Sequence, residues 1–469
     1  MKELWRFVKT SGIYFMGTVL TKLITFLLLP IYTAYIDPDG MGIYDVATAY
    51  VTFLCSVVYL DIWSAVMRFT YEYSGTGQKK PISNGAAIFV CSTLVYSAIM
   101  LGVYMIFHVE YMLFIYFYGL LANMQYFCGY VARTQGKNVL YAAGGIAGSL
   151  VTILANIILL VGFRMDYSAL FLSSCVGYIA NILILVIGAK INRLISVSAY
   201  EKSLFKQMFI FSLPLCVNSV AYWFLSSYNR VAITNVLGTA ANGMYSIAGR
   251  FGSFITLFTS CFTMAWQEIS YSKEAKGMED QSGFYTSAVN SYIRFLGMGL
   301  IMIVPVVYVI YPIMINESYA PGKSMVPLYL MATVASAVSS FLGNIFTAIK
   351  KNDLLFYTTV VGSVVNVLTV HLLLPIMGVQ GASIALFLGF GINCVIRIKM
   401  LQKYLGFTVE WKFLIAFVLM FAIAFGIYNF GNLWMNIAVC IVGAVITLLV
   451  FREPLTKILG NIKDKMEKG

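Results

Sequence analysis

Long apolar runs recur along almost the whole chain, and each is long enough to cross a lipid bilayer. A spanning helix needs about 20 consecutive, mostly apolar residues, and the 469 residues are 60% hydrophobic and 11% charged. Soluble domains carry about 25% charged residues. The sequence therefore predicts an all-α polytopic membrane protein with about 14 transmembrane helices. We expect these helices at 11–36, 43–67, 83–107, 110–132, 140–162, 167–190, 205–232, 242–268, 287–310, 323–347, 355–375, 381–402, 412–429 and 431–451.

Lysine and arginine fall mostly in alternate connections between these runs. If the N-terminus is cytoplasmic, the even-numbered connections and the C-terminal tail hold most of the 31 basic residues, whereas the odd-numbered connections hold only Arg164 and Lys323. We count Arg397, near the end of the twelfth run, among the cytoplasmic residues. This asymmetry is the positive-inside rule, and it predicts that both termini are cytoplasmic. The net charge of +12 therefore reflects topology, and we expect no nucleic-acid partner.

Two short sequence patterns occur twice. GIYDVA at 42–47 returns as GMYSIA at 243–248, and a Lys-Asn pair followed by a Gly-Ser pair occurs at 137–149 and at 351–363. Each pattern recurs at equivalent places in two sets of six expected spans. Parallel repeats of this kind place a substrate cavity between lobes near the bilayer midplane. We expect three parts: an N-terminal six-helix lobe at 1–203, a C-terminal six-helix lobe at 204–405, and an extra helix pair with a basic cytoplasmic tail at 406–469.

Four basic residues lie inside the expected spans: Lys22, Arg230, Arg250 and Arg294. A charge at a helix centre costs about 2.5–3.5 kcal/mol on insertion scales. Arg294 is close to a cytoplasmic end, so its side chain can reach the interface. Lys22 is about 16 Å into the first span at about 1.5 Å per residue. We therefore expect Lys22 to face a cavity or an acidic partner.

Arg230 and Arg250 flank a short turn on the expected outer side. One interpretation is structural: Arg230 would anchor a helix end at the membrane interface, and Arg250 would form an ion pair. The functional alternative is that both line an aqueous vestibule and bind an anion, because planar guanidinium groups match phosphate oxygens.

Asp61 and Arg68 stand two turns apart on one helix face, where a structural pairing through other helices or water is one interpretation. His371, near an outer helix end, is typical of an interface histidine, and a proton relay is the alternative. Because carboxylates deep in the spans are few, the pattern favours an anionic substrate over the organic cations of a cation-coupled extruder.

Motifs of membrane enzymes are absent from the sequence. It has no Walker loop, no HExxH, only two histidines, and expected external loops of a few residues. The eight cysteines lie within apolar runs without metal-ligand spacing. We therefore expect a transporter and not an enzyme such as a polymer ligase, with no cofactor and no metal site, and we leave coupling to Na⁺ or H⁺ open.

Three stretches resemble the bacterial polysaccharide flippases, a family of the MOP (multidrug/oligosaccharidyl-lipid/polysaccharide) exporter superfamily. The first is YNRVAITNVLGTAANGMYSIAGR, at 228–250. The second is LLLPIYTAYIDPDGMGIYDVATA, followed by LDIWSAVMRF. The third is GSVVNVLTVHLLLPIMGVQGASIALFLG, at 362–389. The superfamily also contains multidrug extruders and lipid II flippases.

The resemblance implies alternating access and a substrate of undecaprenyl-pyrophosphate-linked oligosaccharide. This repeat unit of a surface polysaccharide would move from the cytoplasmic to the outer leaflet of the bacterial cell membrane. The residues carried over to a cationic central cavity are Arg250, Arg230, Lys22 and Arg68. Asn229 stands where the family often has aspartate. Its neutral amide either frees Arg230 for a ligand or weakens the positioning of Arg230.

Several further residues are candidates for sugar contact or coupling: Asp61, Trp223, Tyr228, Trp266 and His371. Aromatic side chains near helix ends also serve packing and interfacial anchoring. The expected partners are the lipid bilayer and the polyprenyl-linked oligosaccharide, with a polysaccharide polymerase and assembly proteins as further candidates. The alternative functions are lipid II flipping and, less favoured, cation-coupled multidrug extrusion.

Overall fold

The structure, a computed structural model, describes residues 24, 26–276, 281–349 and 351–452. Every regular element within these ranges is a helix, which confirms the all-α architecture. The chain divides into two compact units. Unit 1 comprises Met1–Ser246 and Asn366–Val379, and unit 2 comprises Ile247–Val365 and Gln380–Gly469. The three-part division at 1–203, 204–405 and 406–469 stays a prediction.

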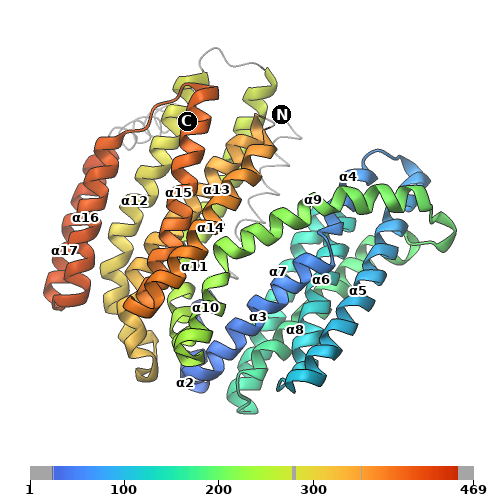
Figure 1. Cartoon of the computed structure of the whole chain (residues 1–469), viewed down its shortest axis with the longest axis horizontal. Helices are drawn as coiled ribbons and strands as arrows, with labels where there is room; N and C mark the ends of the chain where they lie inside the picture. Colours follow the sequence, from blue (N-terminus) through green and yellow to red (C-terminus); the bar gives the residue numbers. More distant parts are fainter. Residues whose placement is uncertain (1–23, 25, 277–280, 350, 453–469) are drawn as a thin grey trace, which may run out of the picture. The chain divides into compact units, whose positions relative to one another are not determined.

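Unit 1 contains a bundle in which α8 packs against both α6 and α7, and α9 packs against α3, α4 and α5 (Figure 1). Its elements are α2 (Leu29–Tyr35), α3 (Pro38–Val58), α4 (Ile62–Thr70), η1 (Gly75–Gln78), α5 (Lys79–Phe107), α6 (Met112–Thr134), α7 (Asn138–Ile157), the π turn η2 (Ile158–Gly162), α8 (Ser168–Ala189), η3 (Ile191–Arg193), η4 (Val197–Ala199), α9 (Lys202–Ser226) and α10 (Tyr228–Leu237).

Two long helices are shared between the units. The first residues of α11 (Thr239–Lys276) belong to unit 1, and the rest belong to unit 2. The last part of α14 (Asn352–Met377) belongs to unit 1, and its first part to unit 2.

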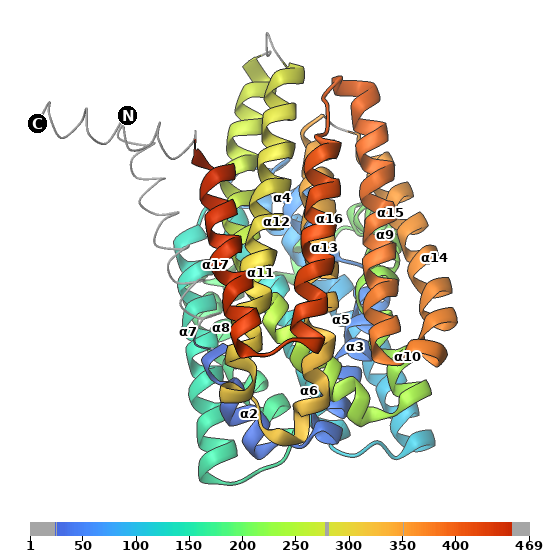
Figure 2. The ribbon, with the colours of Figure 1, turned by 90° about the vertical axis from the view of Figure 1, so that its left-hand side faces the viewer.

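Unit 2 ends in a pair of helices that packs against α12 (Figure 2). These helices are α16 (Trp411–Phe430) and α17 (Leu433–Val450), close to the expected 412–429 and 431–451. Small residues allow the close contact, since Gly297 of α12 faces the Phe417 ring and Gly443 of α17 faces Ile301. The remaining elements are α12 (Gln281–Met314), η5 (Glu317–Met325), α13 (Val326–Ala348) and α15 (Val379–Leu405).

Eleven helices in the described ranges are long and apolar enough to span a membrane. The multi-pass architecture is confirmed, but the count of 14 is not. The expected first span, 11–36, lies mostly outside the described residues. The helices α6 and α11 are long enough but are not among the eleven. Tyrosines and amides lower the hydropathy of α6, and Arg250 with several glycines, serines and threonines lowers that of α11.

The expected second span, 43–67, is divided into α3 and α4. The break lies at Leu60 and Asp61, whose φ values of 55° and 53° are in the left-handed region. Asp61 precedes α4, and its carboxylate accepts a hydrogen bond from the Ser64 hydroxyl at 3.1 Å. The sequence has no glycine or proline here, so hydropathy alone does not reveal the break.

The GIYDVA repeat and the start of the GMYSIA repeat meet each other inside unit 1. A Cβ atom on Gly42 would lie 1.8 Å from the carbonyl oxygen of Thr239, and one on Gly243 would lie 1.9 Å from that of Pro38. Pro38 and Thr239 each stand four residues before the glycine of their own repeat. The two copies therefore exchange equivalent contacts, as in an isologous interface. Both positions require glycine.

The second repeated pattern also has an equivalent packing role in each copy. A Cβ atom on Gly148 of α7 would lie 2.8 Å from the Gly177 carbonyl oxygen and 2.9 Å from Asn181 Cβ. A Cβ atom on Gly362 of α14 would lie 2.9 Å from the Gly389 carbonyl oxygen. The glycine–serine pair therefore marks a close helix–helix contact in both halves of the chain.

Candidate functional site

Arg230 forms an ion pair with Asp45 at the contact between α10 and α3. Arg230 Nε lies 2.9 Å from Asp45 Oδ2, and the two side chains are 25% and 13% exposed. Asp45 belongs to the GIYDVA copy of the repeat. In the GMYSIA copy, the equivalent position is Ser246. The carboxylate that orients Arg230 therefore comes from α3, although position 229 carries no acid.

Asn229 has a separate role in joining α10 to α14. Its Oδ1 accepts a hydrogen bond from Asn366 Nδ2 at 2.9 Å, and the same Asn366 group donates to the Phe224 carbonyl oxygen at 2.9 Å. Asn229 and Asn366 are 1% and 0% exposed. Buried polar groups stabilise a fold only when they are hydrogen-bonded. The neutral amide at position 229 therefore does not leave Arg230 without a carboxylate, because Asp45 pairs with that arginine.

Trp223, Tyr228 and His371 lie in one aromatic cluster within unit 1. Trp223 is 5% exposed and donates its indole N–H to the Ala49 carbonyl oxygen at 2.9 Å. The Tyr228 hydroxyl is hydrogen-bonded to His371 Nε2 at 2.8 Å. The indole N–H of Trp223 thus has a hydrogen-bond acceptor, and its ring packs against Phe53. Sugar contact or coupling by these three residues stays a prediction.

Asp61 and Arg68 both belong to the α4 region but have different partners. Arg68 Nη1 lies 2.9 Å from Glu72 Oε1, and both side chains are exposed, at 60% and 46%. Asp61 accepts the bond from Ser64 described above. The structure therefore does not bring the two together as a pair. The assignment of Arg68 to a cationic cavity stays a prediction.

Arg250 is partly exposed on α11 in unit 2. The helix packs closely on α13 at this level, because a Cβ atom on Gly249 would lie 3.0 Å from the Tyr329 hydroxyl and one on Gly252 would lie 2.8 Å from Thr333 Oγ1. Lys22 and the side chain of Trp266 lie outside the described residues. A shared cavity for Arg250, Arg230 and Lys22 stays a prediction.

A family model described as polysaccharide biosynthesis protein matches residues 7–267, which is more than half of the chain. The chain belongs to this family. The match includes both copies of the first repeat and both members of the Arg230–Asp45 pair. It places the protein in the MOP superfamily of exporters and supports a role in transport.

Solved structures of the same superfamily share the fold. The lipid II flippase MurJ in an inward closed conformation is 15% identical over 94% of this chain and 99% of that chain, with a TM-score of 0.69. An inward-facing multidrug resistance MATE family transporter is 13% identical over 82% and 95%, with a TM-score of 0.63. A point mutant of the Vibrio cholerae MATE transporter VcmN is 16% identical over 85% and 96%, with a TM-score of 0.55. Comparison with curated proteins gave no significant match.

Arg397 is a buried charged residue that the sequence does not reveal. It lies on α15, is 4% exposed, and donates to the hydroxyls of Thr358 at 3.0 Å and Thr359 at 3.1 Å. Arg397 does not belong to a connection between helices, because α15 continues to Leu405 and the guanidinium is enclosed by α13, α14 and α15. Its place on the cytoplasmic side stays a prediction. At the equivalent position of the first half, four residues after the packing asparagine, stands buried Leu185.

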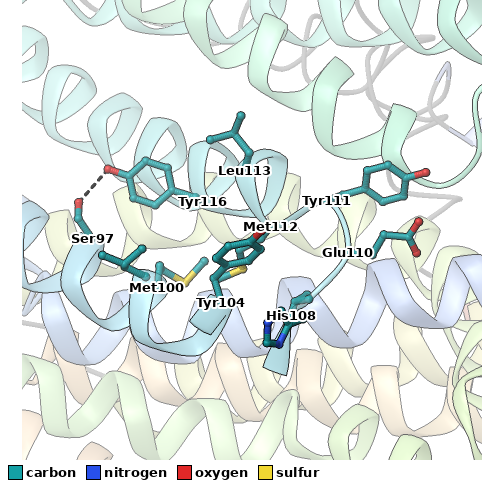
Figure 3. Close-up of a pocket in the computed structure, with 11 residues that line it drawn as sticks. Ser97, Met100, Tyr104, His108, Glu110, Tyr111, Met112, Leu113 and Tyr116 are labelled. Carbon is teal, nitrogen blue, oxygen red and sulfur yellow. Dashed lines mark hydrogen bonds between the residues drawn. The ribbon is translucent and has the colours of Figure 1, made fainter. Parts of the chain in front are cut away.

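A cavity of about 670 Å³ lies at the connection between α5 and α6 (Figure 3). Ser97 and Tyr116 are hydrogen-bonded at 2.8 Å on one side, and Glu110 and Tyr111 lie on the other. Tyr111 donates to Asp166 Oδ2 at 2.7 Å. This hydrogen bond to a carboxylate raises the pKa of Tyr111 to about 12. The cavity has no arginine or lysine among its described lining residues, so it is distinct from the expected cationic site.

Proposed function

We propose that the protein is a flippase for an undecaprenyl-pyrophosphate-linked oligosaccharide, the repeat unit of a surface polysaccharide. It would move this lipid from the cytoplasmic to the outer leaflet of the bacterial cell membrane by alternating access. The observation that carries the proposal is the family match over residues 7–267 in a chain with eleven candidate spanning helices among its described residues. The distribution of lysine and arginine supports cytoplasmic termini.

The charged headgroup requires cations in a region of low dielectric constant. Arg230 is suited to this role because Asp45 binds its Nε edge and fixes the plane of the guanidinium group. We propose that Arg230 and Arg250, with Lys22 and Arg68, receive the pyrophosphate or acidic sugars. An anion near Arg230 would compete with Asp45 for the same guanidinium, so release of the substrate restores the ion pair.

The polyprenyl tail requires an apolar path, and unit 2 has a groove with that chemistry. A groove of about 420 Å³ lies between α12, α16 and α17. Its described lining is entirely apolar and includes Ile301, Ile427 and Val439. Burial of prenyl surface there would be favourable by about 25 cal/mol per Å² relative to water. We propose that the tail runs along this groove while the sugars pass through an aqueous path.

The proposal is tested by mass spectrometry of lipid extracts from cells that lack the gene. We expect one polyprenyl-linked oligosaccharide to accumulate and the surface polymer to disappear, with both effects reversed by the wild-type gene. An unchanged lipid-linked pool together with an intact surface polymer would remove the flippase proposal. Measuring surface polymer in wild-type cells after the sodium or the proton gradient is collapsed tests coupling to each ion.

Lipid II flipping is a second candidate, because the MurJ structure has the same fold over 94% of this chain. At 15% identity this likeness concerns the fold alone. The two functions differ in whether cells tolerate loss of the gene, since lipid II export is needed for peptidoglycan. If the deletion is lethal and lipid II accumulates on depletion, the second candidate replaces the first. If the deletion strain instead loses resistance to toxic organic cations, that result would support a multidrug extruder.

A further inference from the structure

A second cavity in unit 1 has a lining unlike that of the apolar groove. Its volume is about 500 Å³, and it is bounded by α3, α4, α6 and α8. Sites for small molecules commonly have volumes of about 300–1,000 Å³. None of the arginines or lysines proposed for the headgroup is among its described lining residues. The cavity therefore needs an explanation separate from the cationic site.

Aromatic side chains from α4, α6 and α8 line this cavity. Trp63 of α4 and Tyr126 of α6 are stacked, with ring centroids 5.3 Å apart and an interplanar angle of 27°. Tyr126 is 55% exposed, so Trp63 does not cover the whole of its side chain. Tyr118 of α6 and Tyr178 of α8 form the other pair, with centroids 5.8 Å apart. Each of these rings combines flat apolar faces with a polar N–H or O–H group at its edge.

Amide and hydroxyl groups are also among the residues that line the cavity. Thr52 donates to the Thr48 carbonyl oxygen at 2.7 Å, and Ser56 donates to that of Thr52 at 2.8 Å. Because each hydroxyl proton is used within α3, the oxygen lone pairs remain as acceptors. Gln125 of α6 adds a primary amide, which supplies donors and an acceptor, whereas Asn123 is 4% exposed and donates to the Gly119 carbonyl oxygen at 2.7 Å.

The described lining residues of this cavity are all uncharged. An acyl chain would leave the Gln125 amide facing hydrocarbon, at a cost of about 1–3 kcal/mol for a polar group without a hydrogen bond. A phosphate or carboxylate would find no cationic partner among these residues. A neutral polyhydroxylated ring suits both kinds of lining group, since its C–H faces can contact the aromatic rings and its hydroxyls can bond to the Gln125 amide and to the oxygens of Thr52 and Ser56.

We propose that this cavity is a subsite for a neutral sugar residue of the transported oligosaccharide. The inference rests on the proposed function and adds the chemical class of one sugar and the side chains that recognise it. The pyrophosphate and any acidic sugar would lie elsewhere, at the arginines. The protein would then select its substrate by the uncharged part of the glycan as well as by its charge.

The test uses photo-crosslinking to the native substrate in living cells. The photoreactive residue p-benzoylphenylalanine replaces Tyr126 in the full-length chain, and the same residue at Ile427 in the apolar groove serves as a control. After irradiation, mass spectrometry identifies the adducts. We expect adducts at position 126 to carry hexose or N-acetylhexosamine, and adducts at position 427 to carry prenyl or acyl chains.

Adducts at position 126 that contain only acyl chains, or no adduct there while position 427 captures prenyl lipid, would overturn the inference and leave the flippase proposal intact. A deletion strain without accumulated lipid-linked oligosaccharide would instead overturn the flippase proposal itself. A second readout is export by Gln125→Leu, which keeps the side-chain size and removes the amide. We expect a roughly tenfold loss of export, about 1.4 kcal/mol at 25 °C, for Gln125→Leu but not for Tyr116→Phe on the same helix.

Discussion

At the scale of single residues, the partly buried ion pair between Asp45 and Arg230 is the clearest positioning contact in the described part of the chain. Replacing Asp45 with asparagine keeps its shape and removes the negative charge beside Arg230. We expect the free energy of unfolding to fall by about 1–3 kcal/mol, which lies between the contributions of exposed and of fully buried ion pairs. Thermal unfolding of the purified protein in detergent measures this change.

The exposed pair between Arg68 and Glu72 is the matched control for that experiment. Its side chains are 60% and 46% exposed, so Glu72→Gln should change stability by less than about 1 kcal/mol. Equal effects of the two substitutions would show that the burial of the Arg230 pair has no energetic consequence.

Arg250 is the residue on which we expect transport to depend most directly. Arg250→Ala removes a cation proposed to meet the pyrophosphate, so surface polymer should be lost while the protein remains inserted at wild-type abundance. Immunoblotting of membranes and quantification of the polymer measure the two properties separately. Normal export by this variant would remove Arg250 from the binding site.

The sequence identifies Arg230 but not the residue that orients it. The pairing of Asp45 with Arg230 depends on α3 and α10 being brought together in the fold, and no local pattern records that contact. The sequence likewise does not reveal that Arg397 is buried within a helix. A positive charge near a helix end usually reaches the interface, but here hydroxyls on α14 bind the guanidinium.

At the scale of helices, the contact between the two repeats makes a strong steric prediction. Gly42→Ala places a methyl group where a backbone carbonyl oxygen lies 1.8 Å away, and backbone cannot yield as a side chain can. We expect the α3–α11 contact to open, with a lower unfolding temperature and reduced export.

A second glycine provides the control for the steric prediction. Gly102 lies within α5, and no heavy atom lies within 4 Å of the position that a Cβ would take there. Gly102→Ala should therefore be neutral, or stabilising by up to about 1 kcal/mol through helix propensity. If Gly42→Ala behaves like Gly102→Ala, the close contact between the repeats does not exist in the folded protein.

Hydropathy predicts the positions of most helices because a helix in lipid must be apolar over its whole length. It fails where a helix has a role other than facing lipid. The polar and aromatic side chains of α6 line the neutral cavity, and the same side chains keep α6 from being among the apolar spans. The break at Leu60 and Asp61 escapes prediction because it is made by backbone conformation without glycine or proline.

At the scale of the whole molecule, family membership and fold agree on an exporter of the MOP superfamily. The chemistry of its parts is divided in a way that fits a lipid-linked glycan. Under the proposed function, arginines would receive the charged linkage, the apolar groove the tail, and the uncharged aromatic cavity a sugar. Composition and charge distribution predict the membrane architecture, whereas the substrate depends on side-chain geometry that no sequence pattern encodes.

The most direct test of the flippase proposal measures movement of the lipid itself. Proteoliposomes containing the purified protein are loaded with the lipid-linked oligosaccharide that accumulates in the deletion strain, and periodate added outside oxidises the exposed glycans. With wild-type protein we predict that nearly all of the glycan becomes accessible over time, whereas Arg250→Ala vesicles keep about half protected, as protein-free vesicles do. Equal protection in wild-type and protein-free vesicles would contradict the account.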